Sequence, residues 1–181
     1  MKKIIAAFGV LVGLVAISLT GFYLYTKSHS PSTKTGYNDV LSASYSGPYK
    51  KGREVFGKLV PFGQVWRTGA NWATTFTTKQ EVRFKEQTLM AGKYSIWTVP
   101  RKDHWEVIVN EETGQWGIDP ISKEANRDPE HDVIKVNVPV FRTEKVVEQF
   151  NIVFEGRDNE VEMVMIWDQT MVAVPIEIIN Q

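Results

Sequence analysis

The sequence predicts an all-β domain, an antiparallel β-sandwich of the jelly-roll or a related type, preceded by one N-terminal hydrophobic helix. Three observations support this fold class: an uncharged apolar run over residues 4–25, a period of two in the apolar residues beyond position 80, and polar turns between these runs. We therefore divide the chain into an N-terminal anchor at residues 1–25, a flexible linker at 26–36 and a β domain at 37–181.

The N-terminal segment has the length and composition of a membrane anchor. Residues 4–25 carry no charge and follow Lys2 and Lys3. As a helix they would rise about 33 Å, which matches a hydrocarbon core of about 30 Å. The two lysines favour a cytoplasmic N-terminus, so we expect a single-pass protein of the cytoplasmic membrane with its domain in the periplasm or outside the cell. A cleaved signal peptide is the alternative and would export the same domain.

The segment between the anchor and the domain, residues 26–36, is rich in Ser, Thr, Lys, Pro and Gly. Such a polar composition cannot support a core and predicts a flexible spacer.

Alternating apolar residues predict the strands of the domain in order. The pattern is strongest at residues 81–85, 94–99, 104–109, 133–140, 150–154, 161–167 and 171–178. The second and third of these form a predicted hairpin, and residues 168–170 form a predicted turn. Only residues 143–149 have the cap and spacing of a helix.

The charge balance gives no reason to expect nucleic acid as a partner. The chain has 21 basic and 21 acidic residues, and four of the basic residues precede the first acid, Asp39, which leaves a mildly acidic domain. The absence of cysteine excludes disulfides and thiolate metal sites. The group Asp128, Glu130, His131 and Asp132 lacks a calcium-loop spacing, so it predicts a solvated loop, and we expect no metal and no cofactor.

The candidate ligand-binding residues lie mainly in a glycine-rich stretch, residues 45–75, which predicts a shaped loop. Its 66–72 loop places a guanidinium, a hydroxyl and an amide between two indoles. A guanidinium suits a carboxylate or phosphate, and an indole can stack on a sugar. The candidates are Arg53, Trp66, Arg67, Thr68, Asn71, Trp72 and Trp116. Each also has a structural interpretation, as a core anchor or as a tie for loop carbonyls.

Several long blocks carry a family resemblance: Lys51-Gly52-Arg53, Leu59-Val60-Pro61-Phe62-Gly63, Val65-Trp66-Arg67-Thr68-Gly69-Ala70-Asn71, Ala91-Gly92-Lys93-Tyr94-Ser95 and Gly114-Gln115-Trp116-Gly117. They resemble the signature of a widespread bacterial family of secreted and envelope proteins catalogued as a domain of unknown function. The resemblance covers residues 45–178 and implies export and a β-rich fold, but no activity. Gly47-Pro48-Tyr49 departs from the family pattern, so no role is carried over to Tyr49.

Three functions remain open. The sequence favours a non-catalytic envelope module that binds a small polar or anionic ligand, or a glycan, through the 66–72 loop. An envelope hydrolase that uses this loop as a substrate clamp is the second, although no nucleophile elbow is present and Glu54 is the one acid of the signature stretch. A structural or protein-interaction domain is the third, and it predicts that Arg67 and Asn71 are buried with every polar atom satisfied internally.

Overall fold

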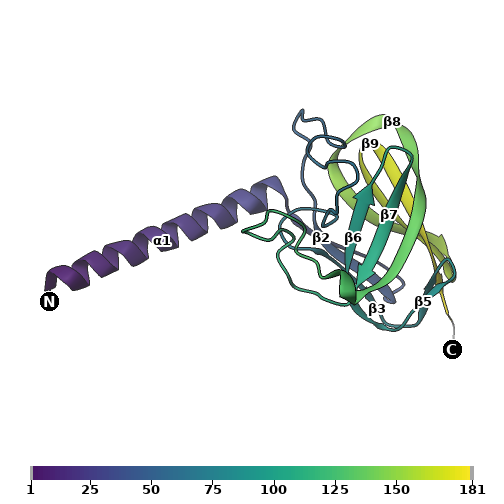
Figure 1. Cartoon of the computed structure of the whole chain (residues 1–181), viewed down its shortest axis with the longest axis horizontal. Helices are drawn as coiled ribbons and strands as arrows, with labels where there is room; N and C mark the ends of the chain where they lie inside the picture. The colour runs from purple at the N-terminus through teal and green to yellow at the C-terminus, as the bar shows by residue number, and fades with distance from the viewer. Residues whose placement is uncertain (1, 180–181) are drawn as a thin grey trace.

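The computed structural model describes residues 2–179, apart from the side chains of residues 2–14 and 27. Helix α1 projects from one side of a β domain (Figure 1). The elements are α1 (Lys2–His29), β1 (Ser32–Tyr37), β2 (Leu41–Ser46), β3 (Thr74–Thr78), β4 (Val82–Phe84), β5 (Gln87–Leu89), β6 (Gly92–Pro100), β7 (His104–Asn110), the 3₁₀ helix η1 (Pro129–His131), β8 (Asp132–Arg157) and β9 (Glu160–Ile178).

The nine strands of the described residues pair in one antiparallel sheet, in the order β1-β2-β3-β6-β7-β8-β9-β4-β5. The long β8 belongs to two parts of it, because its first residues pair with β7 and its later residues pair with β9. The predicted antiparallel β fold with one N-terminal helix is therefore confirmed, as is the hairpin of β6 and β7. The strand order describes one open sheet of nine strands.

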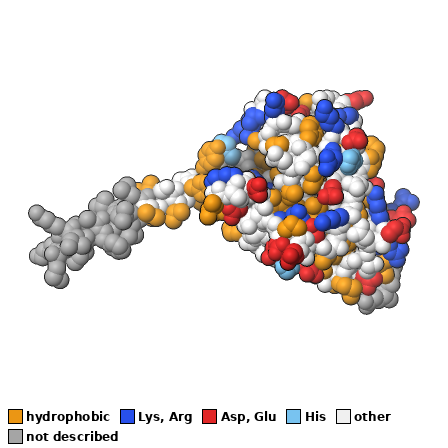
Figure 2. Space-filling view, viewed as in Figure 1, with side chains coloured by type: hydrophobic (Ala, Val, Ile, Leu, Met, Phe, Trp, Pro, Cys, Tyr) orange, Lys and Arg blue, Asp and Glu red, His pale blue; other side chains and the backbone are white. Residues whose placement is uncertain are grey.

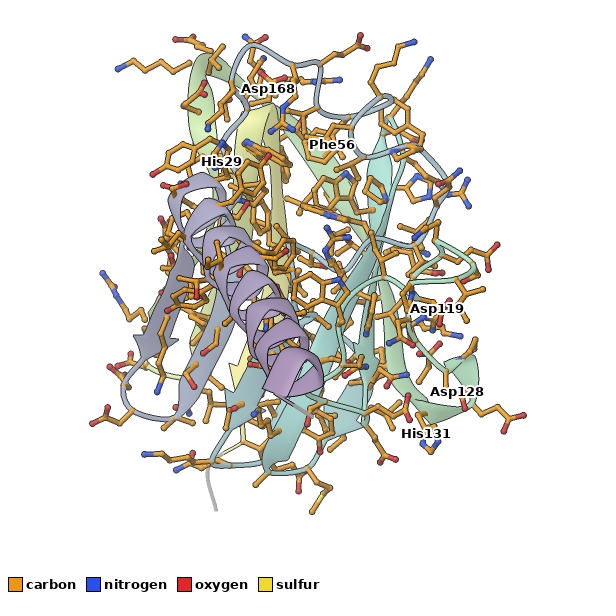
Figure 3. All side chains as sticks on the ribbon, turned by 90° about the vertical axis from the view of Figure 1, so that its left-hand side faces the viewer. His29, Phe56, Asp119, Asp128, His131 and Asp168 are labelled. Atoms are coloured by element: carbon orange, nitrogen blue, oxygen red, sulfur yellow. The ribbon has the colours of Figure 1, made fainter. Side chains whose placement is uncertain are left out.

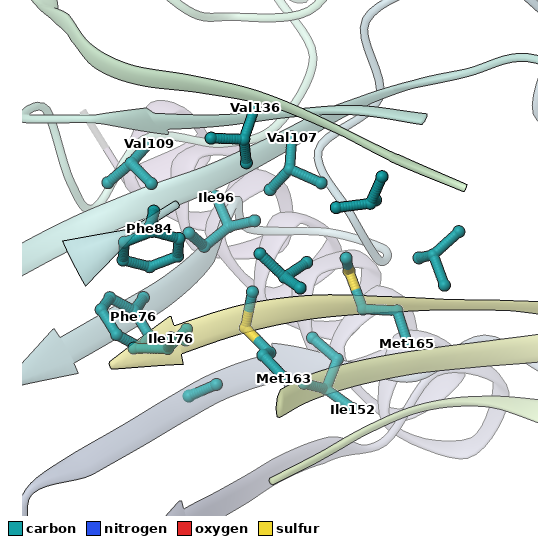
Figure 4. Packing of buried hydrophobic residues seen from close by; sticks show 14 of the residues in the cluster. Phe76, Phe84, Ile96, Val107, Val109, Val136, Ile152, Met163, Met165 and Ile176 are labelled. Atoms are coloured by element: carbon teal, nitrogen blue, oxygen red, sulfur yellow. The ribbon is translucent and has the colours of Figure 1, made fainter. Parts of the chain in front are cut away.

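Both halves of the sheet line one hydrophobic core. Figure 4 shows Met163 and Met165 of β9 on one side of this core, with Ile96 of β6 and Val107 of β7 on the other. All four side chains are buried. The alternation of apolar and polar residues along β9 produces this arrangement, because successive side chains of a strand point to opposite faces.

The alternation in β9 changes phase at Asp168. The buried side chains have odd numbers over residues 161–167, apart from Val164, and even numbers over residues 172–178. Asp168 has a φ of 55°, and the pairing of β9 with β8 is irregular at this point. The predicted turn at residues 168–170 is therefore wrong: these residues continue β9 opposite a bulge in β8, and the buried face of the strand changes there without the strand ending.

Residues 143–149, predicted as a helix, lie within β8 instead. Arg142 pairs with Thr170 and Val147 pairs with Asp168, so the intervening residues of β8 outnumber those of β9. The surplus residues of β8 form a bulge. Regular pairing on both sides of the bulge imposes an extended backbone, and this tertiary constraint overrides a weak local preference for helix.

Helix α1 contains the predicted anchor and carries exposed hydrophobic side chains over its described part (Figure 2). Within the part of the chain that the structure describes, no helix is both long enough and apolar enough to cross a membrane.

The segment 26–36 differs from the predicted flexible spacer. Its first residues complete α1, and residues 32–37 form the edge strand β1, which pairs with β2 along its whole length. The Ser and Thr residues of β1 give no apolar alternation, so the strand depends on backbone hydrogen bonds to β2, which the sequence pattern does not reveal.

Candidate functional site

Two loops meet on the side of the domain from which α1 leaves, one preceding β3 and one following β7 (Figure 1). The backbone N–H of Gly117 donates to the carbonyl of Asn71 at 2.9 Å, and the N–H of Ala73 donates to the carbonyl of Gln115 at 3.1 Å. Two motifs that are separate in the sequence, the 66–72 loop and the segment 114–117, therefore form one structural unit.

Trp66 and Thr68 belong to the scaffold of this unit. The indole of Trp66 is buried, donates through Nε1 to the carbonyl of Gly69 at 2.9 Å, and stacks on Trp167 with ring centroids 6.1 Å apart. Thr68 is also buried, and its hydroxyl lies 3.2 Å from that of Thr98. Its φ of 54° is strained for a β-branched residue. Both residues hold the loop in place from within.

Arg53 fastens a different turn. Its Nε donates to the carbonyl of Lys50 at 2.9 Å, and a terminal nitrogen donates to the carbonyl of Tyr49 at 2.5 Å. The Lys50 ammonium forms an ion pair with Asp168, and Figure 3 places Asp168 at the end of the domain opposite Asp128. Arg53 therefore ties loop carbonyls together and does not line the pocket next to Arg67.

Arg67 lines a pocket of about 650 Å³ between residues 59–67 and residues 117–129. Its aliphatic stem lies against Gly117, where an added Cβ would be only 1.9 Å from the Cδ of Arg67. The absence of a side chain at Gly117 is what makes room for the arginine. The two motif blocks thus shape the pocket together.

The guanidinium of Arg67 is the most unusual polar group of this pocket. Its Nε is buried without a hydrogen-bond partner, and no ion pair to Arg67 occurs among the described residues. Burial lowers the pKa of Arg67 from its ordinary value, although an arginine keeps its charge under all physiological conditions. A partly buried cation without a counterion is costly to maintain, which sets Arg67 apart from the paired cations of this region.

The acidic loop differs from the predicted solvated loop. Asp128 caps η1 and is exposed, but Asp132 at the start of β8 has a side chain only 2% exposed. Burial raises the pKa of Asp132, and hydrogen bonds outweigh this effect and place the pKa below its ordinary value. The donors are Arg127, Asn110 and Lys135. Figure 3 shows Asp128 and His131 close together at this end of the domain.

Two further cations line the pocket and were not singled out from the sequence. Arg127 is already paired with Asp132, whereas Lys123 lies in the wall opposite Arg67 together with one carboxylate, Glu124. Figure 2 shows charges of both signs interspersed over the visible face of the domain, so no broad surface patch predicts this pocket. Arg127 and Lys123 lie some 60 positions from Arg67 in the sequence, so only the folded structure shows that they line the same pocket.

Asn71, Trp72 and Trp116 face a second hollow of about 330 Å³, between α1 and the domain. Trp72 is 57% exposed and meets Trp116 edge to face, with ring centroids 5.4 Å apart. The ring centroid of Phe22, on α1, lies 6.3 Å from that of Trp116. The seven predicted residues thus fall into separate places. Trp66 and Thr68 belong to the scaffold, and Arg67 lines the first pocket. Asn71, Trp72 and Trp116 face the hollow beside α1, and Arg53 lies apart from all of these.

Fold and site together define an antiparallel β domain with an N-terminal helix and a pocket lined by an arginine that has no counterion among the described residues. The chain belongs to the family described as Protein of unknown function (DUF2911), whose model matches residues 28–176. This match confirms the family resemblance and includes β1 and both loops of the candidate site. No curated protein and no solved structure matches the chain.

Proposed function

We propose that this protein is a non-catalytic binding module for a small anionic ligand, with Arg67 as the residue that recognises it. The observation that carries the proposal is the buried Nε of Arg67, which lacks a hydrogen-bond partner at the wall of a pocket of about 650 Å³. A carboxylate or phosphate in the pocket would provide the missing counterion, in the forked geometry that a guanidinium prefers.

The chemistry of the pocket walls supports binding over hydrolysis. The described lining residues include no Ser, Thr, Tyr or His, so they offer neither a nucleophile with its base nor an imidazole. Glu124 is their one carboxylate, whereas glycoside hydrolysis uses two. The unsatisfied Nε of Arg67 also weighs against a purely structural role, which requires that all polar atoms of the loop be satisfied internally.

Thermal shift measurements on the full chain, with inorganic phosphate, citrate and glucuronate as probes, test the proposal. We expect at least one probe to raise the Tm of the wild type and to lose this effect in Arg67→Met. Stabilisation at a hundredfold excess over Kd amounts to about 2.7 kcal/mol, which such an assay resolves. Arg53→Met is the matched control, since Arg53 is outside the pocket and should leave the effect intact. Equal protection of Arg67→Met and wild type would contradict the proposal.

We also propose that the domain lies outside the cytoplasmic membrane and is tethered by residues 4–25. The support is the uncharged N-terminal run after Lys2 and Lys3. Protease added to spheroplasts should digest the domain, and alkaline carbonate should leave the chain in the membrane fraction. Mass analysis of the mature N-terminus separates an uncleaved anchor from a cleaved signal peptide, and a domain protected from external protease would refute the placement.

The finer architecture that we propose is the jelly-roll-like sandwich. Phe76 of β3 packs against Phe154 of β8 with ring centroids 6.3 Å apart, although these strands are not neighbours in the sheet. Such a contact across the core is what two facing layers require. An experimental structure with β3 and the end of β8 in one flat layer would contradict it.

A further inference from the structure

We propose a second binding site, distinct from the Arg67 pocket: the face of β1, β2 and β3 next to Trp72 binds a neutral saccharide chain. Two hollows of about 330 Å³ each adjoin Trp72, one over the strands and one beside α1. Both are lined by Trp72, Ser32 and Ser46, so they form one continuous groove with the indole at its centre. A groove of this form suits an extended ligand.

The floor of the groove is a row of hydroxyl groups fixed by strand register. Ser32 pairs with Ser46, and Ser44 pairs with Thr75 on the next strand. Because paired residues share a face of the sheet, these hydroxyls point to the same side. Among the described residues, none of these four hydroxyls makes a hydrogen bond with another part of the protein. Ser46 is only 5% exposed, so the hydroxyls that can bond to those of a sugar are those of Ser32, Ser44 and Thr75.

Trp72 provides the apolar partner that a sugar ring needs. A pyranose exposes C–H groups on its face and hydroxyls on its edge, which matches an indole beside a row of hydroxyls. The backbone bridge and the edge-to-face contact between Trp72 and Trp116 hold the indole in position. An exposed tryptophan that is fixed in this way loses little conformational freedom when a ligand stacks on it.

The charge of the groove favours a neutral ligand. Among the described residues that line the hollow over the strands, Lys34 is the one charged side chain, and the described residues that line the hollow beside α1 include no charged side chain. The groove and the Arg67 pocket share no lining residue. The saccharide site therefore stands whether or not the Arg67 pocket binds an anion.

Affinity electrophoresis of the full-length protein in native gels that contain hydroxyethylcellulose, galactomannan or soluble starch tests this proposal. We expect at least one polysaccharide to retard the wild type and Trp72→Ala to weaken that binding about tenfold. Trp72→Phe should restore part of it, and Ser44→Ala should weaken it by a smaller factor. Phe141→Ala is the matched control because Phe141, 47% exposed on β8, lies outside the groove. Arg67→Met should bind as the wild type does.

Two results would overturn the saccharide site. One is a wild type that none of the three polysaccharides retards, and the other is a Trp72→Ala variant that is retarded as strongly as the wild type. A lipid surface is the competing occupant of the groove, and binding of the protein to phosphatidylcholine vesicles tests it. Vesicle binding that depends on Trp72, in a protein that ignores all three polysaccharides, would assign the groove to the membrane instead.

Discussion

Replacing Gly117 by alanine tests whether the two motif blocks build the pocket together. The new methyl group would lie 1.9 Å from the Cδ and 2.7 Å from the Cβ of Arg67, so either the arginine or the segment must move. The φ of Gly117 is not in the left-handed region, so the cost comes from the contact and not from the backbone. Overpacking of this kind costs about 1–3 kcal/mol, which lowers the Tm of a chain of this size by roughly 2–12 °C.

A double-mutant cycle isolates this contact. In the Arg67→Ala background the shortest contact disappears and only the one to Cβ remains, so Gly117→Ala should cost at least about 1 kcal/mol less than in the wild type. Gly114→Ala is the control: its φ of 85° makes alanine strained, but no atom lies near the added Cβ, so its cost should be the same in both backgrounds. Thermal unfolding followed by circular dichroism gives all four free energies. Equal costs of Gly117→Ala in the two backgrounds would refute the reasoning.

Three further substitutions have definite expected outcomes. Asp132→Asn should cost about 1.5–3 kcal/mol at pH 7, because Arg127 loses its buried carboxylate. The folded pKa of Asp132 is below its unfolded value of about 3.9, so this stabilisation is complete above that pH and disappears as the pH falls through the folded pKa. In denaturant titrations, the difference in unfolding free energy between Asp132→Asn and the wild type should therefore be smaller at pH 3 than at pH 7. An equal difference at both pH values would contradict the assignment. Trp66→Ala should cost about 3–5 kcal/mol in the same assay, and a loss below about 1 kcal/mol would show that Trp66 is not a core anchor. Asp168→Asn should cost no more than about 1 kcal/mol, since its partly exposed ion pair with Lys50 is screened and Asn tolerates a positive φ; a larger loss would give this pair a structural role.

The strands of the fold could be predicted because one face of each is buried. In β9 the alternation of apolar residues is visible in the sequence, and the structure buries them as expected. The predictions of secondary structure fail where pairing with a neighbouring strand, and not burial of one face, determines the backbone conformation. Residues 143–149 are mostly polar and lie in a bulge, so their extended form follows from regular pairing with β9 on either side. β1 has the same property, because its side chains alternate without any apolar signal.

The candidate site was predictable in part, for a similar physical reason. The 66–72 loop contains Arg67 and Trp72, the two residues on which the proposed sites depend, and the glycines of residues 45–75 predicted a shaped loop. The sequence could not show that Gly117 makes room for Arg67, or that Lys123 lines the same pocket. Those relations arise from the meeting of two loops, and no local pattern encodes them.

The 66–72 loop does not form the single clamp that its sequence suggests, because Arg67 and Trp72 line different hollows. Thr68, Gly69 and Asn71 all have positive φ values, of 54°, 151° and 62°. These turns separate Arg67, which lines one pocket, from Trp72, which stands in a groove that shares no residue with it. The strain at Thr68 is sustained by buried hydrogen bonds, among them the one that its carbonyl accepts from the hydroxyl of Thr74 at 2.6 Å. A loop that is held so firmly in this shape presents a cation and an indole to two separate cavities, so we expect that either side chain can be removed without disturbing the cavity that the other one lines.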